Sequence, residues 1–188
     1  MSTDKKTLYF SFFSGIDLRI ANNFMTFCNN AIKEHDPGEL YFFIASGGGD
    51  VDSGFVMSNY LTSLHGHIKI TMHNVGNIDS IANVIFISAD KRFAAPNAAF
   101  LFHGVAINAI GALSRMALKE NLTRCQGMED RIIATMSSRS KLSPATLQEL
   151  FNQGEGKDVN FALEHGIIDE IQTPVLPPGA VHLVMNFQ

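Results

Sequence analysis

The sequence is poor in cysteine and in charged residues. Its 188 residues include two cysteines, Cys28 and Cys125, which lie far apart and form no C-x-x-C pair. This spacing argues against a secreted disulfide framework and against a cysteine-based zinc or redox site. It favours a reducing, cytoplasmic location.

Long apolar runs and a strong net charge are also missing. The longest apolar runs fall well short of the ~20 residues that a membrane-spanning helix needs. The polar N-terminus, MSTDKK, lacks the apolar core of a signal peptide. A formal net charge of −4 without a Lys/Arg run provides no attraction to nucleic acid or to an anionic membrane. We expect no nucleic-acid partner and no membrane partner.

The composition is typical of a packed globular domain. Hydrophobic residues make up 46 % of the chain and charged residues 17 %, which suggests that partner subunits cover part of the surface. The length suits one domain. We place that domain at residues 1–172, followed by a Pro-rich C-terminal tail at residues 173–188. The tail is either an arm that packs on a neighbouring subunit or a loosely ordered terminus.

Strand-like and helix-like patterns alternate along the chain, which predicts an α/β domain with a mainly parallel sheet. The helix after GGG has Asp52 or Ser53 as its expected N-cap, and the helix after residue 142 has Ser143 as N-cap and Pro144 at its first position. Strands are expected at residues 7–15, 39–46, 67–76 and 98–103, and helices at 16–36, 52–66, 79–89, 112–136, 143–154 and 158–166.

Ser80 is the first candidate for chemistry. It follows a strand expected to end at Gly76, and the pair Asp79-Ser80 opens the helix expected at residues 79–89. A serine there is either a helix cap or a nucleophile, because free backbone N–H groups at a helix start can also bind an oxyanion.

His103 is the best-placed of seven histidines to serve as the base that a nucleophilic serine needs. It ends an apolar strand, at the sheet edge where α/β proteins usually bind substrates. The alternative is a core histidine that is hydrogen-bonded to backbone.

The glycine-rich stretch SGGGDVDSG at residues 46–54 resembles a phosphate-binding loop only in its glycine content. It has neither the lysine of a P-loop nor the spacing of a dinucleotide-binding loop, which disfavours nucleotide binding. Its glycines can instead donate N–H groups to an oxyanion, or they form an ordinary tight turn. His65 and His67 have no suitably spaced third metal ligand.

Taken in order and spacing, these segments resemble the proteolytic subunit of the Clp protease, ClpP, within the wider crotonase-like fold. The resemblance covers about residues 8 to 172. It rests on Ser46-Gly47-Gly48-Gly49, Gly76 to Ile81, Lys91-Arg92, Pro96-Asn97, His103, and the ending from Phe161 to Asp169.

The resemblance implies that Ser80 is the acyl-forming nucleophile and His103 its general base. It implies that the backbone N–H groups of Gly49 and Ile81 form the oxyanion hole. No metal or organic cofactor is implied. It further implies a homo-oligomeric ring with a handle-type helix at 112–136, a peptide or unfolded-protein substrate, and an AAA+ ATPase as a possible partner.

The sequence departs from the family pattern at several positions. Asp79 replaces a small apolar residue beside Ser80, and we interpret it as the cap of the following helix. The family's third triad residue, an aspartate, falls at Gly154, so the orienting residue is Asn152, Glu155 or none.

We therefore expect a ClpP-like serine endopeptidase. The alternatives are a catalytically weak or inactive ClpP-like scaffold or regulatory subunit, and a crotonase-like acyl-CoA enzyme.

Overall fold

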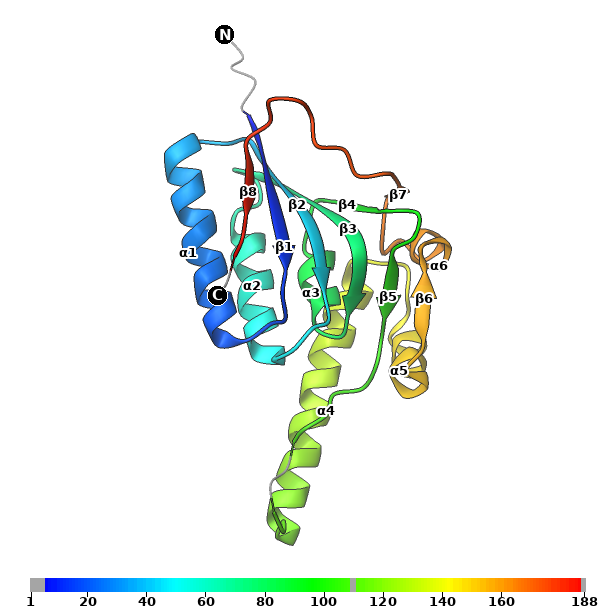
Figure 1. The fold of residues 1–188 in the computed structure, drawn as a ribbon. Coiled ribbons are helices and arrows are strands. Elements are labelled where there is room, and N and C mark those ends of the chain that lie inside the picture. Colours follow the sequence, from blue (N-terminus) through cyan, green and yellow to red (C-terminus); the bar gives the residue numbers. More distant parts are fainter. Residues whose placement is uncertain (1–5, 109–110, 187–188) are drawn as a thin grey trace.

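The computed structural model describes residues 6–108 and 111–186, which form a mixed α/β fold around one mostly parallel sheet (Figure 1). Along the sheet the strand order is β6-β5-β3-β2-β1-β8, while β4 pairs with β3 and β7. The pairing of β5 with β6 is antiparallel and the other pairings are parallel. The strands are β1 (Thr7–Phe13), β2 (Glu39–Ser46), β3 (Lys69–Asp79), β4 (Lys91–Ala94), β5 (Ala99–Leu101), β6 (Gly156–Asp158), β7 (Glu170–Ile171) and β8 (His182–Val184).

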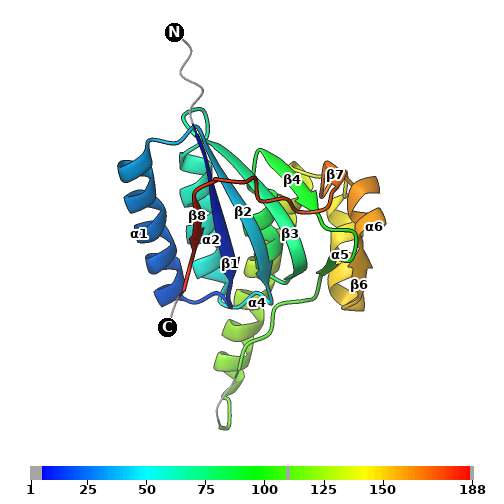
Figure 2. The same ribbon diagram turned by 45° about the horizontal axis from the view of Figure 1, so that its top comes forward.

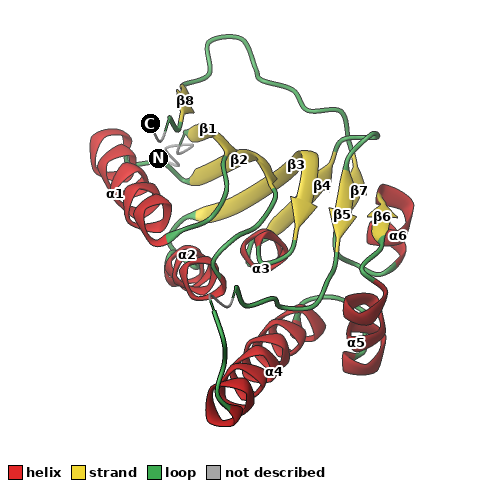
Figure 3. Cartoon of the chain, turned by 60° about the horizontal axis from the view of Figure 1, so that its bottom comes forward, coloured by secondary structure: helices red, strands yellow, loops and turns green. Residues whose placement is uncertain are grey.

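The helices are α1 (Leu18–His35), α2 (Val51–Ser63), α3 (Ala82–Ile87), α4 (Arg115–Ser138), α5 (Pro144–Gln153) and α6 (Val159–Glu164). Figure 3 shows α1, α2 and α3 together on one side of the sheet. The long helix α4 extends away from the body of the domain (Figure 1). No helix within the described residues is long and apolar enough to cross a membrane.

The core between the sheet and α1 is built from phenylalanine rings. Phe10 and Phe42 stack with their centroids 5.0 Å apart, and Phe24 of α1 meets Phe12 edge to face at 5.6 Å. All four side chains are almost completely buried. Burial of each such side chain contributes about 1.5–3 kcal/mol, so this cluster fixes how α1 lies on β1 and β2.

The other side of the sheet carries a second aromatic group. The parallel register of β1 and β2 places Tyr9 beside Tyr41, and their ring centroids are 5.1 Å apart. Tyr41 Oη also lies 2.8 Å from Nδ1 of the buried His73. The His73 Nε2–H donates to the Gln172 carbonyl at 2.8 Å, so Nδ1 of the neutral ring is the acceptor for the tyrosine hydroxyl.

The alternation of strands and helices is confirmed, and several element boundaries need correction. Asp50, rather than Asp52 or Ser53, is the N-cap of α2, because its carboxylate accepts the Ser53 N–H at 2.8 Å. The long helix begins at Arg115 after the N-cap Ser114 and continues to Ser138. Strands β4, β6 and β7 were not expected, since two to four residues are too few to show a pattern of their own. The expected cap of α5, Ser143, is confirmed, and Asp158 is the N-cap of α6.

The C-terminal tail returns to the sheet (Figure 2). Residues 182–184 form β8, which pairs in parallel with β1, and the Tyr9 N–H donates to the Val181 carbonyl at 3.0 Å. This pairing corrects the expectation of a loosely ordered terminus. Contact with a neighbouring subunit and the domain boundary at residue 172 stay predictions.

Candidate functional site

Ser80 occupies the turn between β3 and α3. The sequence pattern predicts a helix from Asp79, but β3 continues to Asp79 and α3 begins at Ala82. Asp79 stays in the strand because it pairs with Leu101 of β5. The expectation that Asp79 caps the helix is therefore wrong: the N-cap position is Ile81, and no side chain caps it.

The backbone of Ser80 is strained. Its φ is 57°, in the left-handed region that costs a residue with a side chain roughly 1–2 kcal/mol. Among the described residues, the other non-glycine with positive φ is Asp36, at the C-cap of α1. A serine on a sharp, strained strand-to-helix turn is the geometry in which a nucleophilic hydroxyl is presented at a sheet edge.

Asn83 holds this turn in place. Its side-chain amide is almost fully buried and donates to the carbonyls of Ser80 and Leu101, both at 3.0 Å, and of Ile78 at 3.3 Å. The Ser80 N–H also donates to the Leu101 carbonyl at 3.0 Å. Asn83 was not among the site residues predicted from the sequence. Its signal is a polar residue three positions after Ser80, inside an otherwise apolar helix.

The glycine-rich loop after β2 lies against the Ser80 turn. A Cβ added to Gly48, whose φ is +80°, would lie 2.7 Å from Ser80 Cβ and 2.7 Å from the Asp79 carbonyl oxygen. Only a glycine allows this approach. The structure therefore places the glycine stretch of residues 47–49 directly beside Ser80.

The backbone N–H groups of Gly49 and Ile81 are free in the described part of the chain. The residues on either side of Gly49 pair with Ile16: the Ile16 N–H donates to the Gly48 carbonyl, and the Asp50 N–H donates to the Ile16 carbonyl. Neither bond uses the Gly49 N–H. Ile81 likewise donates to no backbone carbonyl there. Neither N–H therefore has an acceptor of its own among the described residues.

His103 lies just beyond β5 and is exposed. His103 and Ser80 line the same cavity, whose volume is about 10 Å³. The other residues that line this cavity are Asn83, Phe102, Val105, Ile132 and Phe151. That volume is no more than one water needs, so the cavity brings the two side chains together without holding a substrate residue. Within residues 6–108 and 111–186, no hydrogen bond joins Ser80 to His103.

The His103 ring is oriented by backbone. Its Nδ1 lies 2.8 Å from the Gly104 carbonyl oxygen. A carbonyl can only accept, so Nδ1 carries the proton and Nε2 keeps its lone pair. A neutral imidazole in this tautomer can take a proton from a hydroxyl at Nε2.

The structure brings Gly154 close to His103. A Cβ added to Gly154 would lie 4.0 Å from His103 Cβ. Asn152 and Glu155 are exposed, and the Glu155 carboxylate is 3.1 Å from Lys157 Nζ. Over the described residues neither hydrogen-bonds to His103, so the position of the expected aspartate is occupied by a residue without a side chain.

Asp79 adds a carboxyl group near this site. Burial raises the pKa of Asp79, while the positive charge of a protonated His103 acts in the opposite direction. Its side chain does not line the cavity between Ser80 and His103.

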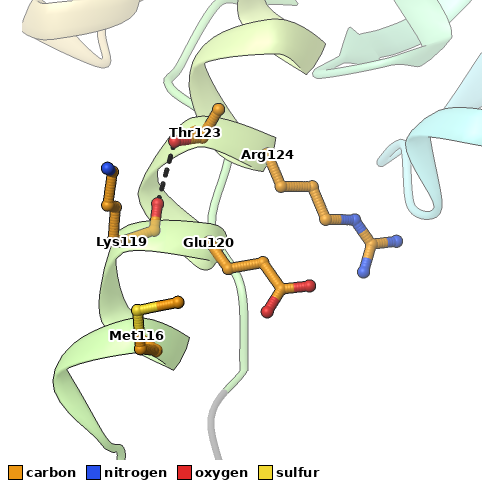
Figure 4. Close-up of a pocket in the computed structure, with 5 residues that line it drawn as sticks. All are labelled: Met116, Lys119, Glu120, Thr123 and Arg124. Atoms are coloured by element: carbon orange, nitrogen blue, oxygen red, sulfur yellow. Dashed lines mark hydrogen bonds between the residues drawn. The ribbon is translucent and has the colours of Figure 1, made fainter.

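A larger surface hollow of about 590 Å³ lies on α4 (Figure 4), and none of its lining residues lines the cavity at Ser80. Met116, Lys119, Glu120, Thr123 and Arg124 line it, and the Thr123 hydroxyl bonds to the Lys119 carbonyl of its own helix. This hollow has no activated nucleophile and no buried polar group. His65 Nδ1 lies 3.6 Å from Asp90 Oδ1, and the described residues contain no group of three His, Cys, Asp or Glu side chains that could hold a metal ion.

Comparison with known families agrees with the fold and the order of the motifs. The profile of the Clp protease family matches residues 9–175, which is most of the chain and includes Ser80, His103 and the glycine-rich loop. The chain belongs to the Clp protease family.

Proposed function

We propose that the protein is a serine peptidase that cleaves peptide bonds in peptides or unfolded proteins through a Ser80 acyl-enzyme. The observation that carries this proposal is the left-handed backbone of Ser80, at the end of a parallel strand and on a cavity shared with His103. Membership of the Clp protease family supports a peptidase.

In the proposed reaction, the Ser80 hydroxyl attacks the scissile carbonyl carbon and passes its proton to Nε2 of His103. The carbonyl oxygen becomes an oxyanion and accepts hydrogen bonds from the N–H groups of Gly49 and Ile81. His103 then protonates the leaving amine, the peptide bond breaks, and an acyl ester on Ser80 remains. Water, deprotonated by His103, hydrolyses the ester. No metal or organic cofactor takes part.

We further propose that the chain acts as a homo-oligomeric ring. The half of α4 that extends beyond the domain carries the exposed apolar residues Met116, Leu118 and Leu122, with exposed fractions of 76 %, 55 % and 60 %. Apolar side chains gathered on one protruding helix favour contact with another copy. An AAA+ ATPase that delivers unfolded chains is a possible partner of such a ring. Cys28 and Cys125 are both free thiols, which fits a reducing cytoplasm.

Covalent labelling tests the proposed chemistry. The purified protein is treated with a fluorophosphonate and its intact mass is followed with time, beside Ser80→Ala and His103→Ala. We expect one label per chain in the unmodified protein, none in Ser80→Ala, and strongly slowed labelling in His103→Ala. Labelling that persists in Ser80→Ala would refute the assignment of the nucleophile. No labelling of the unmodified protein would favour an inactive scaffold subunit, and retention on immobilised CoA would favour an acyl-CoA enzyme.

A further inference from the structure

One peptide group beside the site has both of its hydrogen-bonding atoms engaged. This is the peptide between Gly104 and Val105. Its carbonyl oxygen lies 2.8 Å from His103 Nδ1, and its N–H donates to Oε1 of Glu129 on α4, also at 2.8 Å. The imidazole and the Glu129 carboxylate are therefore connected through a single peptide unit.

We propose that Glu129 is a positioning residue for His103 and acts through the Gly104–Val105 peptide. The proposal rests on the proposed function of His103 as the general base. The peptide carbonyl holds the Nδ1–H tautomer, and the carboxylate on the N–H of the same peptide strengthens that carbonyl as an acceptor. This is the cooperative effect expected in a chain of hydrogen bonds, about 10–30 % per bond.

The approach of Glu129 depends on a glycine. A Cβ added to Gly104 would lie 2.9 Å from Glu129 Oε1, so any side chain there would displace the carboxylate. The Gly104 N–H donates to the Phe151 carbonyl at 3.1 Å. Helices α4 and α5 therefore hold the segment that follows His103 from two sides, one through a side chain and one through backbone.

The arrangement matters because no carboxylate in the described part of the chain hydrogen-bonds His103 directly. In a serine-histidine-aspartate triad the aspartate fixes the tautomer and stabilises the imidazolium that forms in the reaction. Here Gly154, where an added Cβ would lie 4.0 Å from His103 Cβ, has no side chain. Glu129 supplies negative charge to the same ring nitrogen one peptide farther away.

The test compares four variants with the unmodified protein. Glu129→Ala removes the acceptor, and Glu129→Gln keeps a neutral acceptor of the same length. Gly104→Ala displaces the carboxylate without altering it. Asp130→Asn is the matched control, because Asp130 is the adjacent exposed acid on the same helix turn and makes no hydrogen bond or ion pair within the described residues.

Two readouts are made on each variant. The first is the ring tautomer of His103, from long-range ¹H–¹⁵N correlation spectra of histidine-labelled protein, with His103→Ala identifying the signals. The second is kcat and KM for a fluorogenic peptide. We expect Glu129→Ala and Gly104→Ala to lower kcat by up to about fivefold with KM unchanged, because a bond to a charged ring that weakens by about 10–30 % loses only a fraction of its contribution. Their His103 signals should shift from the Nδ1–H form toward a tautomer mixture.

Glu129→Gln should recover most of the tautomer preference and part of kcat, and Asp130→Asn should match the unmodified protein. An unchanged tautomer and unchanged kcat in Glu129→Ala would overturn the proposal, as would equal losses in Glu129→Ala and Asp130→Asn. The spectra need no turnover. A protein that fails to cleave or label but shows the tautomer shift in Glu129→Ala therefore refutes the proposed function and supports the positioning role.

Discussion

Adding a carboxylate at Gly154 should increase the activity of this protein. Gly154 is the C-cap of α5, with φ 63° and ψ 37°, and its N–H donates to the Leu150 carbonyl. A side chain at this position would begin 4.0 Å from His103 Cβ. We expect the carboxylate of Gly154→Asp to turn toward the imidazolium that forms as Ser80 gives up its proton.

The 4.0 Å separates the two Cβ atoms, so the gain is worked for an aspartate side chain that turns its carboxylate to about 4 Å from the ring, and it is scaled by the exposure of His103. Two unit charges about 4 Å apart attract by about 1 kcal/mol in water and about 4 kcal/mol at the effective dielectric of a protein surface. Because His103 is exposed, we take the lower part of this range, about 1–2 kcal/mol, which corresponds to roughly 5- to 30-fold in rate. The left-handed backbone costs the folded state about 1 kcal/mol, which aspartate and asparagine tolerate better than other residues.

The assay is the second-order rate of fluorophosphonate labelling, together with kcat/KM for a peptide substrate. Gly154→Asn is the matched control, because it has the same shape and backbone cost without the charge. We expect Gly154→Asp to exceed both the unmodified protein and Gly154→Asn. In the Glu129→Ala background the gain should be larger, because the new carboxylate then replaces a contribution that is missing.

Equal rates in Gly154→Asp and Gly154→Asn would refute the reasoning, since the charge would then have no effect on the reaction. A Gly154→Asp variant slower than the unmodified protein would show that the carboxylate draws His103 away from Ser80. Urea denaturation of both variants separates these results from a loss of folded protein.

Three further predictions concern the turn and the sheet. Gly48→Ala should lower the free energy of unfolding by about 1–3 kcal/mol and abolish labelling, because its Cβ would lie 2.7 Å from Ser80 Cβ. Gly47→Ala is the control: a Cβ there would have no atom within 4 Å, so this variant should match the unmodified protein in urea denaturation and in labelling. Asn83→Leu should cost about 1–3 kcal/mol in the same urea measurement, because it removes the donor shared by three carbonyls; an unchanged midpoint would contradict its role in the turn. Burial lowers the pKa of His73 below 6.5. As pH falls, the histidine is therefore protonated at a lower pH in the folded state than in the unfolded state. The free energy of unfolding should then decrease below pH 6.5, by at most about 1.4 kcal/mol per pH unit for this group. When urea denaturation is repeated from pH 7 to 5, His73→Gln should reduce this pH dependence of the free energy of unfolding, whereas His67→Gln, at an exposed position, should not. The same pH dependence in both variants would exclude the buried histidine as its cause.

Local patterns were sufficient where one element carries its own signal. The strand at residues 39–46 and the Ser143-Pro144 start of α5 were predicted correctly. A strand buried on both faces and a capped helix start each have a signal in neighbouring residues. The order of the glycine loop, Ser80 and His103 was enough to identify the family resemblance. The roles of these residues remain predictions that labelling can test.

Local patterns failed where a distant strand decided the outcome. Asp79 and Ser80 look like a helix start, but pairing with Leu101 extends β3 through Asp79 and forces Ser80 into the left-handed turn. The tail looks like a loose terminus until β1 provides an unpaired edge for β8.

The sequence by itself determined the alternating α/β pattern, the family and the residue types available for chemistry, because these depend on periodicity and on motifs of neighbouring residues. Only the tertiary structure decided that Gly154 faces His103 and that Glu129 reaches the peptide beside it. Those contacts join residues that are tens of positions apart. Their distances follow from how α4 and α5 pack against the strand ends, which no local pattern specifies.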